Sequence, residues 1–272
     1  SRLRLTLRFL TSNLYDYDLN EHEKLWSLYK NQEGFDLGRY VLTEVNKLNN
    51  VFMNSFRKYD FKTPLENLYE FTNKTLSNFF FDCVKNPLYL RKLKSEDRLK
   101  LQVAMFELLK AMFDMVKVYA PFVAEEFYVD FFRNETSVFE FRYFTKEKVN
   151  ELNNLLVVFN WNNLMSYRKE VSAKLDPLQK NKEVKAKTEV AVKLYLEKED
   201  LDALQHMSTN YRLRELFNVS EVFLLESSSF NVEFELLAKN ENYDKCPKCW
   251  GYSLRETFEK GLCNVCFNDE LE

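Results

Sequence analysis

Two closely spaced cysteine pairs near the C-terminus constrain this chain more than any other feature. Cys246 and Cys249 form one Cys-x2-Cys pair, and Cys263 and Cys266 form a second pair thirteen residues later. A tight turn at each pair presents two sulfurs along the edge of a tetrahedron, which is how four thiolates bind a zinc ion. Because four cysteines leave no open coordination position for water, the site is predicted to be structural rather than catalytic.

Disulfide bonds and four unconnected thiols are the alternatives to a zinc site. Disulfides require an oxidising compartment, and no apolar signal segment opens the chain. The fifth cysteine, Cys83, lies in the apolar run from Phe79 to Val84 and is predicted to be a small buried side chain rather than a ligand. The sequence therefore favours a tail folded around zinc.

Composition excludes several classes of function. A net charge of −3 argues against a protein held to nucleic acid by bulk electrostatics. Only four glycines occur, and no GxGxxG or Walker pattern is present. His22 is predicted to lie at the surface, and His206 at the surface or boundary of a helix; neither has a nucleophile beside it. No stretch approaches the roughly 18–20 apolar residues of a membrane span. The chain by itself is predicted to be non-catalytic.

Residues 1–136 are predicted to form an antiparallel helical bundle. Apolar positions from Leu37 to Phe56 recur with the spacing of one helix face. Thr63 is predicted to cap the next helix, and Pro87 is predicted to end it. A further long helix follows, and Pro121 is expected to interrupt it. Long amphipathic helices with short links are typical of such a bundle.

From residue 137 to residue 240 the pattern is that of a small α/β module. A short strand is predicted at Phe139–Tyr143, and a helix is predicted from Leu152 to Ser172, with Trp161 on its apolar face. Alternating apolar and polar residues predict strands at 187–196, 219–225 and 230–237. The predicted fold class is therefore mainly α: a helical bundle, an α/β module and a zinc-binding tail at 241–272.

Several motifs are similar to those of a known family. They are Leu5–Leu10 with Asn13–Asp16, Tyr59-Asp60-Phe61, Leu76–Asp82 with Lys85 and Leu88-Tyr89, Ala120-Pro121 with Ala124–Glu126, Glu189–Val192, and the four-cysteine tail with Trp250. Together they span nearly the whole chain and resemble the C-terminal region of a bacterial-type class I isoleucyl-tRNA synthetase. The bundle motifs are shared with the valyl, leucyl and methionyl enzymes, so the equivalent region of one of these is an alternative. The cysteine tail with its tryptophan favours the isoleucyl family.

The resemblance implies a part of a larger enzyme that joins L-isoleucine to its tRNA with ATP. The ATP-binding HIGH and KMSKS motifs and the editing insertion are absent from this chain, so ATP and catalysis are expected in the remaining part of the parent. The chain is expected to bind the anticodon stem-loop of isoleucine tRNA and the catalytic domain of its own parent, as a monomer. The expected location is a bacterial cytosol or an organelle.

Trp250, directly after the first cysteine pair, is a candidate stacking platform for an unpaired base. The alternative is that its ring packs against the metal-binding loop at Cys246 and Cys249, which we call the knuckle. Lys245, Lys248 and Arg255 flank the same knuckle and are predicted to contact phosphates.

A second basic stretch runs from residue 168 to residue 187, where seven basic and three acidic residues give a net charge of +4. Arg168, Lys174, Lys180 and Lys182 are its candidate RNA contacts, and a solvated helix face is the alternative interpretation. A rival function from another class is a zinc-dependent module that docks onto another protein. Salt dependence separates the two, because phosphate contacts weaken steeply with salt.

Overall fold

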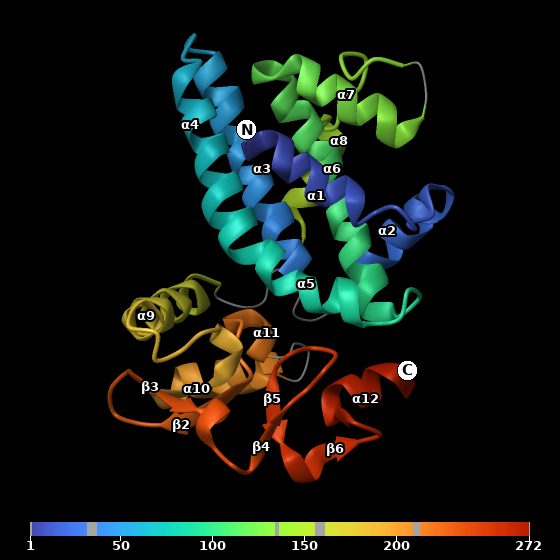
Figure 1. Cartoon of the computed structure of the whole chain (residues 1–272). Coiled ribbons are helices and arrows are strands. Elements are labelled where there is room, and N and C mark those ends of the chain that lie inside the picture. The colour runs from blue at the N-terminus through green and yellow to red at the C-terminus, as the bar shows by residue number, and fades with distance from the viewer. Residues whose placement is uncertain (1, 32–36, 134–135, 156–160, 209–212, 272) are drawn as a thin grey trace. The chain divides into compact units, whose positions relative to one another are not determined.

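The computed structural model describes residues 2–31, 37–133, 136–155, 161–208 and 213–271 (Figure 1). Contacts divide the chain into two compact units. The first comprises residues 1–81 with 96–157, and the second comprises residues 82–95 with 158–272. Helices dominate, and every described strand lies in the second unit, which confirms the predicted class of helical bundle, α/β module and cysteine-rich tail. No described helix combines the length and the apolar character needed to cross a membrane.

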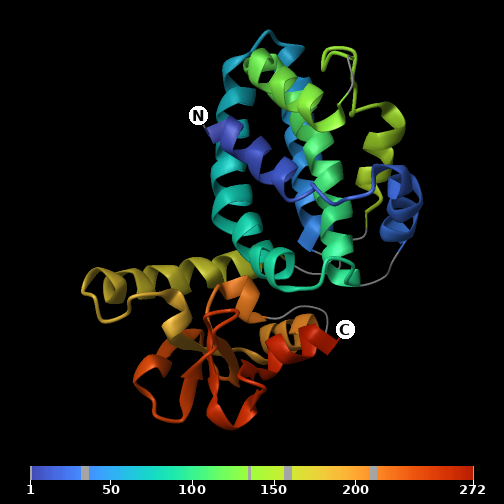
Figure 2. The same ribbon diagram turned by 45° about the vertical axis from the view of Figure 1, so that its right-hand side comes forward.

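The first unit is a helical bundle. Its elements are α1 (Arg2–Ser12), η1 (Leu19–Glu21), α2 (His22–Asn31), α3 (Leu37–Phe56), α4 (Lys62–Glu70), the π-helical segment η2 (Phe71–Phe80), α6 (Glu96–Tyr119), α7 (Pro121–Phe132) and α8 (Lys146–Asn153). The helix α6 packs against α1, α2, α3 and α7, so it is buried on nearly every side (Figure 2). The break between α6 and α7 falls at Pro121, as the sequence predicts.

One prediction about the capping of these helices is wrong, and another falls outside the described residues. The capping side chain of α4 is Asp60 rather than Thr63, because the Asp60 carboxylate accepts hydrogen bonds from the backbone N–H groups of Lys62 and Thr63, each at 3.1 Å. Asp36 directly precedes the predicted helix at 37–56 and is a candidate N-cap from its residue type, but it lies outside the described residues.

Residues 139–143 form no strand. The backbone turns there, with the Glu140 N–H donating to the Ser137 carbonyl at 3.0 Å. The Tyr143 N–H donates to the carboxylate of Asp114 on α6 at 2.8 Å, so this segment pairs with a side chain instead of a neighbouring strand. The predicted helix 152–172 is also divided, since α8 ends at Asn153 and the next helix begins at Trp161.

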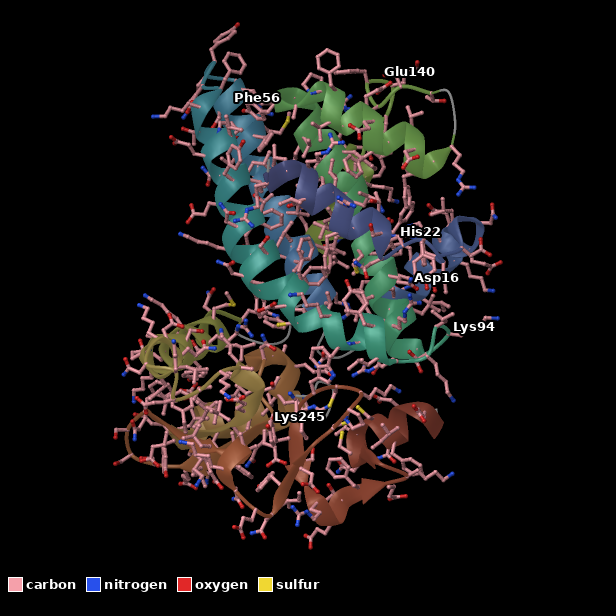
Figure 3. The ribbon with its side chains drawn as sticks, viewed as in Figure 1. Asp16, His22, Phe56, Lys94, Glu140 and Lys245 are labelled. Atoms are coloured by element: carbon pink, nitrogen blue, oxygen red, sulfur yellow. The ribbon has the colours of Figure 1, made fainter. Side chains whose placement is uncertain are left out.

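A buried polar cluster holds the first unit together, and it overturns the prediction that His22 is solvated. His22 is 2% exposed. Its side chain is labelled in Figure 3. Its Nε2 lies 2.7 Å from Oε1 of Glu107, and the hydroxyl of Tyr17 lies 2.7 Å from its Nδ1. Glu107 is fully buried and also accepts a hydrogen bond from the Tyr143 hydroxyl at 2.8 Å.

Two lysines complete this cluster. The Lys110 ammonium lies 2.5 Å from Glu107, and the Lys148 ammonium lies 3.1 Å from it. Lys148 also lies 2.9 Å from Glu151, which in turn accepts a hydrogen bond from the indole of Trp26 at 3.1 Å. The cluster therefore joins α2, α6 and α8 through charges that are paired inside the bundle.

These contacts predict that the first unit loses stability in acid. The His22 hydrogen bond and the two lysines hold the pKa of Glu107 below its usual value against the opposing effect of burial. Hydrogen bonds from Lys30, Lys148 and Trp26 likewise lower the pKa of Glu151 to about 2. A carboxylate with a lowered folded pKa contributes stability that is present above its unfolded pKa, usually 4.5, and lost as pH falls toward the folded value.

We therefore expect the melting temperature of the bundle to be nearly constant from about pH 7 to pH 5 and to fall between about pH 4.5 and pH 2. Circular dichroism at 222 nm across this range measures it. Glu151→Gln removes one of the titrating groups, so its melting temperature is expected to fall less steeply below about pH 4.5. An equally steep fall in that variant would contradict the contribution of Glu151 to the loss of stability in acid.

The second unit begins with α5 (Phe81–Leu90), whose first residue belongs to the first unit. It continues with α9 (Trp161–Lys180), η3 (Lys187–Glu189), β1 (Val190–Leu196), α10 (Lys198–Ser208), α11 (Leu213–Phe217), β2 (Glu221–Glu226), β3 (Asn231–Leu236), η4 (Leu237–Lys239), β4 (Tyr243–Lys245), β5 (Tyr252–Leu254), η5 (Arg255–Thr257), β6 (Phe258–Glu259), β7 (Leu262–Cys263) and α12 (Asn264–Leu271). Pro87 does not end α5, because packing of the surrounding buried residues overrides the local preference of proline.

The main sheet of this unit has the order β2-β1-β3. The central strand β1 pairs in parallel with β2 and antiparallel with β3, and its side chains are mostly buried. The helices α10 and α11 connect β1 to β2 and pack against β2, as a parallel crossover requires. All three strands predicted from alternation are confirmed, and Trp161 is buried, as predicted.

Candidate metal centre and its surroundings

The four cysteines of the two pairs converge on one point. Their Sγ atoms all lie within 4.8 Å of one another, a set of ligands that could hold a metal ion. Cys246, Cys263 and Cys266 are buried, and Cys249 is half-buried. Thiolates around a tetrahedral zinc are separated by about 3.7 Å, so the cluster fits such an ion with small adjustments.

The first pair lies in the loop between β4 and β5, and backbone hydrogen bonds set its shape. The Cys246 N–H donates to the Gly251 carbonyl at 2.8 Å, and the Trp250 N–H donates to the Cys246 carbonyl at 2.9 Å. Trp250 has a left-handed φ of 61°. A side chain at Gly251 would approach the Cys249 Sγ at 3.6 Å and the Ser220 Oγ at 3.3 Å, so the loop has little space for any other residue there.

The second pair is presented by the hairpin β6–β7 and the helix α12. Lys260 and Gly261 connect the strands with φ values of 47° and 82°, the combination of a two-residue type I′ turn. Cys263 ends β7, and Cys266 lies in the first turn of α12. Phe258, Leu262 and Val265 pack around the sulfurs and shield them from water.

The sulfurs are close enough to share protons, which lowers the pKa of the Cys263 thiol and raises the pKa of the Cys249 and Cys266 thiols. The Cys249 Sγ lies 3.8 Å from the Cys263 Sγ. Hydrogen bonds from the Cys249 and Cys266 thiols lower the pKa of Cys263, whereas the contact with Cys263 raises the pKa of Cys249 to about 11. Since the thiolate is the metal-ligating form, a bound cation would replace these shared protons. Cys83 is fully buried, which confirms the prediction of a buried side chain, and burial raises the pKa of its thiol to about 12.

Ser220 fixes the metal module to the α/β sheet, a role that the sequence does not reveal. Its hydroxyl donates to the Thr188 carbonyl and accepts a hydrogen bond from the Tyr252 N–H at 2.7 Å. The Tyr243 hydroxyl donates to Glu221 on β2 at 3.4 Å. The strands β4 and β5, which flank the first cysteine pair, therefore both have hydrogen bonds to the start of β2.

Trp250 lies on the outside of the metal module. Its side chain is 67% exposed, so the ring is not packed into the knuckle. The Lys245 ammonium lies 5.9 Å from the centroid of the indole ring, a cation–π arrangement. An indole and an ammonium are therefore presented together to solvent; Lys245 is labelled in Figure 3.

The other predicted contacts near the knuckle are held by carboxylates. Lys248 lies 3.1 Å from Glu270, and Arg255 makes two hydrogen bonds to Asp244, at 2.8 and 3.1 Å. A phosphate would compete with these carboxylates for the basic groups.

The basic stretch on α9 is less uniform than the sequence suggests. Arg168 is half-buried, and its Nη1 lies 3.7 Å from the Cys83 Sγ, so it is directed inward. Lys174 is exposed but donates to the Asn231 side chain at 2.9 Å and the Val232 carbonyl at 3.1 Å. Lys180 and Lys182 are exposed. The lysines at the end of α9 are thus presented to solvent, and Arg168 is not.

Comparison with known proteins agrees with these features. Residues 38–194 match the family model described as the anticodon-binding domain of tRNA ligase. The chain is similar to isoleucine–tRNA ligases of Buchnera aphidicola subsp. Cinara cedri (25% identical over 98% of this chain and 29% of that protein), Natranaerobius thermophilus (27%, 97% and 29%) and Staphylococcus carnosus (25%, 97% and 28%). The chain thus spans less than a third of the length of these relatives.

Proposed function

The chain belongs to the family of anticodon-binding domains of tRNA ligases, and on that premise we propose that it binds the anticodon stem-loop of an isoleucine tRNA. The relatives named isoleucine–tRNA ligase cover nearly all of this chain, including the cysteine tail, which supports isoleucine tRNA over that of another amino acid. Activation of isoleucine with ATP and its transfer to tRNA would belong to the remaining part of the parent enzyme.

The observation that carries the proposal is the exposed indole of Trp250 on a loop closed by the cysteine cluster. A flat aromatic ring on a rigid loop stacks on an unpaired base, and this contact is worth roughly 1–3 kcal/mol per base. The neighbouring Lys245 and, after release from their carboxylates, Lys248 and Arg255 would contact phosphates. Lys174, Lys180 and Lys182 would extend these contacts along the stem.

We further propose that the metal is zinc and that Cys246, Cys249, Cys263 and Cys266 are its ligands. Four thiolates in a closed tetrahedral set are typical of structural zinc. The ion would fold the tail and hold Trp250 in place. We also propose that the chain has three functional parts, at 1–136, 137–240 and 241–272. It would act as a monomer, in a bacterial cytosol or an organelle.

The first test is Trp250→Ala. Titration of isoleucine tRNA with the zinc-loaded chain, followed by fluorescence anisotropy at two salt concentrations, is expected to show binding that the variant weakens by about 5- to 150-fold, the equivalent of one lost stacking contact. Tyr15→Ala, which removes another exposed aromatic side chain from the first unit, is the matched control and is expected to bind like the unchanged chain.

A tRNA with an altered anticodon separates reading of the loop from general affinity for RNA. Equal affinity for both tRNAs, together with no loss in Trp250→Ala, would contradict anticodon reading. Affinity that hardly changes with salt would support docking onto protein instead, because each phosphate contact adds about 0.7–0.9 to the slope of log affinity against log salt.

A further inference from the structure

A short segment from the middle of the chain belongs to the unit that carries the cysteine cluster. Residues 82–95 group with the C-terminal unit, although the residues on both sides of them group with the bundle. The Cys83 thiol lies 3.8 Å from the Leu216 carbonyl, and the Asn218 amide donates to Asp82 at 3.4 Å. Arg91 lies 3.4 Å from Glu215. Contacts with α11 and the residue that follows it therefore hold this segment in place.

The helix α5 within this segment has a buried face and an exposed face. Cys83, Val84 and Leu88 are at most 5% exposed. Lys85 and Tyr89, four residues apart, lie together on the opposite face, and the Tyr89 side chain is 61% exposed. The aromatic ring therefore projects from a helix whose other face is anchored.

The turn after α5 continues this exposed surface with two lysines. Lys92 and Lys94 are exposed, and a hydrogen bond of 3.1 Å from the Ser95 N–H to the Lys92 carbonyl closes the turn; Figure 3 labels Lys94. Lys85 pairs with Asp82 at 2.8 Å, whereas neither Lys92 nor Lys94 has an ion-pair partner among the described residues. We call Lys85, Tyr89, Lys92 and Lys94 the α5 surface.

The segment that carries the α5 surface has a local excess of positive charge. The segment 82–95 holds four basic residues and one acidic residue, a net charge of +3, in a chain whose net charge is −3. An acidic protein with such a local excess attracts a polyanion to one place without binding it everywhere. An exposed aromatic ring next to lysines is the arrangement that binds single-stranded RNA, because the ring stacks on an unpaired base and the lysines contact its phosphates.

A chain of contacts connects the α5 surface to the metal module within the same unit. The segment contacts Leu216 and Asn218, and two residues later Ser220 accepts the hydrogen bond from the Tyr252 N–H. Gly251, next to Trp250, packs against the same Ser220 hydroxyl. The α5 surface and Trp250 are thus supported by one element, α11 with the turn that follows it.

We propose that the α5 surface is a second RNA-binding site of the C-terminal unit, in which Lys92 and Lys94 contact phosphates and Tyr89 stacks on a base of the tRNA. This inference rests on the proposed function and adds a site to it. It assigns RNA contacts to a segment that belongs to the helical bundle by its position in the sequence, and to the metal-containing unit by its packing.

The test is the double variant Lys92→Glu/Lys94→Glu, measured with isoleucine tRNA on the zinc-loaded chain. Losing two phosphate contacts is expected to reduce the salt slope by about 1.4–1.8 and to weaken binding at low salt by about tenfold or more. Tyr89→Ala is expected to weaken binding by about fivefold or more at every salt concentration. Lys24→Glu/Lys47→Glu is the matched control, because it makes the same charge change at two exposed lysines of the first unit.

The outcomes separate this inference from the function on which it rests. If the unchanged chain binds tRNA and Trp250→Ala weakens it, but Lys92→Glu/Lys94→Glu behaves like its control, the α5 surface is not an RNA site and the proposed function stands. If tRNA affinity falls in Lys92→Glu/Lys94→Glu without a change in salt slope, the two lysines contact no phosphates and the inference is overturned. If the unchanged chain does not bind tRNA, the proposed function fails first. Circular dichroism and zinc content confirm that each variant is folded.

Discussion

Cys246→Ser is expected to abolish stoichiometric zinc binding and to unfold the tail while the bundle remains helical. Cys246 is fully buried among the other three sulfurs, and its backbone closes the knuckle through Gly251 and Trp250. The hairpins β4–β5 and β6–β7 have strands of only two or three residues, too short to be stable without the metal. Small modules of this kind obtain their folding free energy from the ion, roughly 10–16 kcal/mol of binding at pH 7.

The loss is expected to reach RNA binding through Trp250. An unfolded tail no longer holds the indole, so tRNA affinity should fall at least as far as in Trp250→Ala. Inductively coupled plasma mass spectrometry measures zinc content, and circular dichroism at 222 nm follows the helices. Cys83→Ala is the matched control, because it removes a buried thiol outside the cluster and is expected to retain one zinc ion per chain. Full zinc content in Cys246→Ser would contradict the ligand assignment.

The metal tail could be predicted from the sequence because its information is local. Each metal-binding loop has two cysteines in a tight turn and a glycine close by. These local residues determine its conformation with little contribution from the rest of the chain. The strands of the main sheet can also be predicted from the sequence, because alternation over six or seven residues decides which side chains face the core.

His22 could not be predicted, because its environment comes from residues far away in the sequence. Its neighbours are acidic and exposed, which is typical of a surface residue, yet Glu107 on α6 and Tyr17 enclose its ring. The predicted strand at residues 139–143 is wrong for the same reason. Its alternation is typical of a strand, but the Tyr143 N–H donates to the side chain of Asp114 and not to a neighbouring strand. Pairing partners of this kind are visible only when the helices are packed.

The RNA-contacting candidates show the same limit. The sequence identifies a basic residue but not its ion-pair partner, so it does not distinguish Arg255, which pairs with Asp244, from Lys245, which lies beside the Trp250 ring. Arg168 is a candidate by its charge, yet its side chain is directed at Cys83. No local pattern in the sequence predicts the α5 surface, because the segment is held by contacts with distant residues such as that of Cys83 with Leu216 on α11.

Glu107→Ala is expected to destabilise the first unit by about 3–5 kcal/mol, because it leaves two lysines and a histidine without the carboxylate that pairs with them inside the bundle. Urea denaturation followed by the helical signal measures this loss. Glu96→Ala is the matched control on the same helix. Glu96 pairs with Lys100 at the surface, and such a pair contributes about 0–1 kcal/mol.

Glu107→Gln separates charge from shape at this site. The amide retains the volume of the side chain and can still accept the hydrogen bond from the Tyr143 hydroxyl, but it no longer neutralises Lys110 and Lys148. A loss between those of Glu96→Ala and Glu107→Ala is therefore expected. If Glu107→Ala were no more costly than Glu96→Ala, the buried cluster would not be what joins α2, α6 and α8.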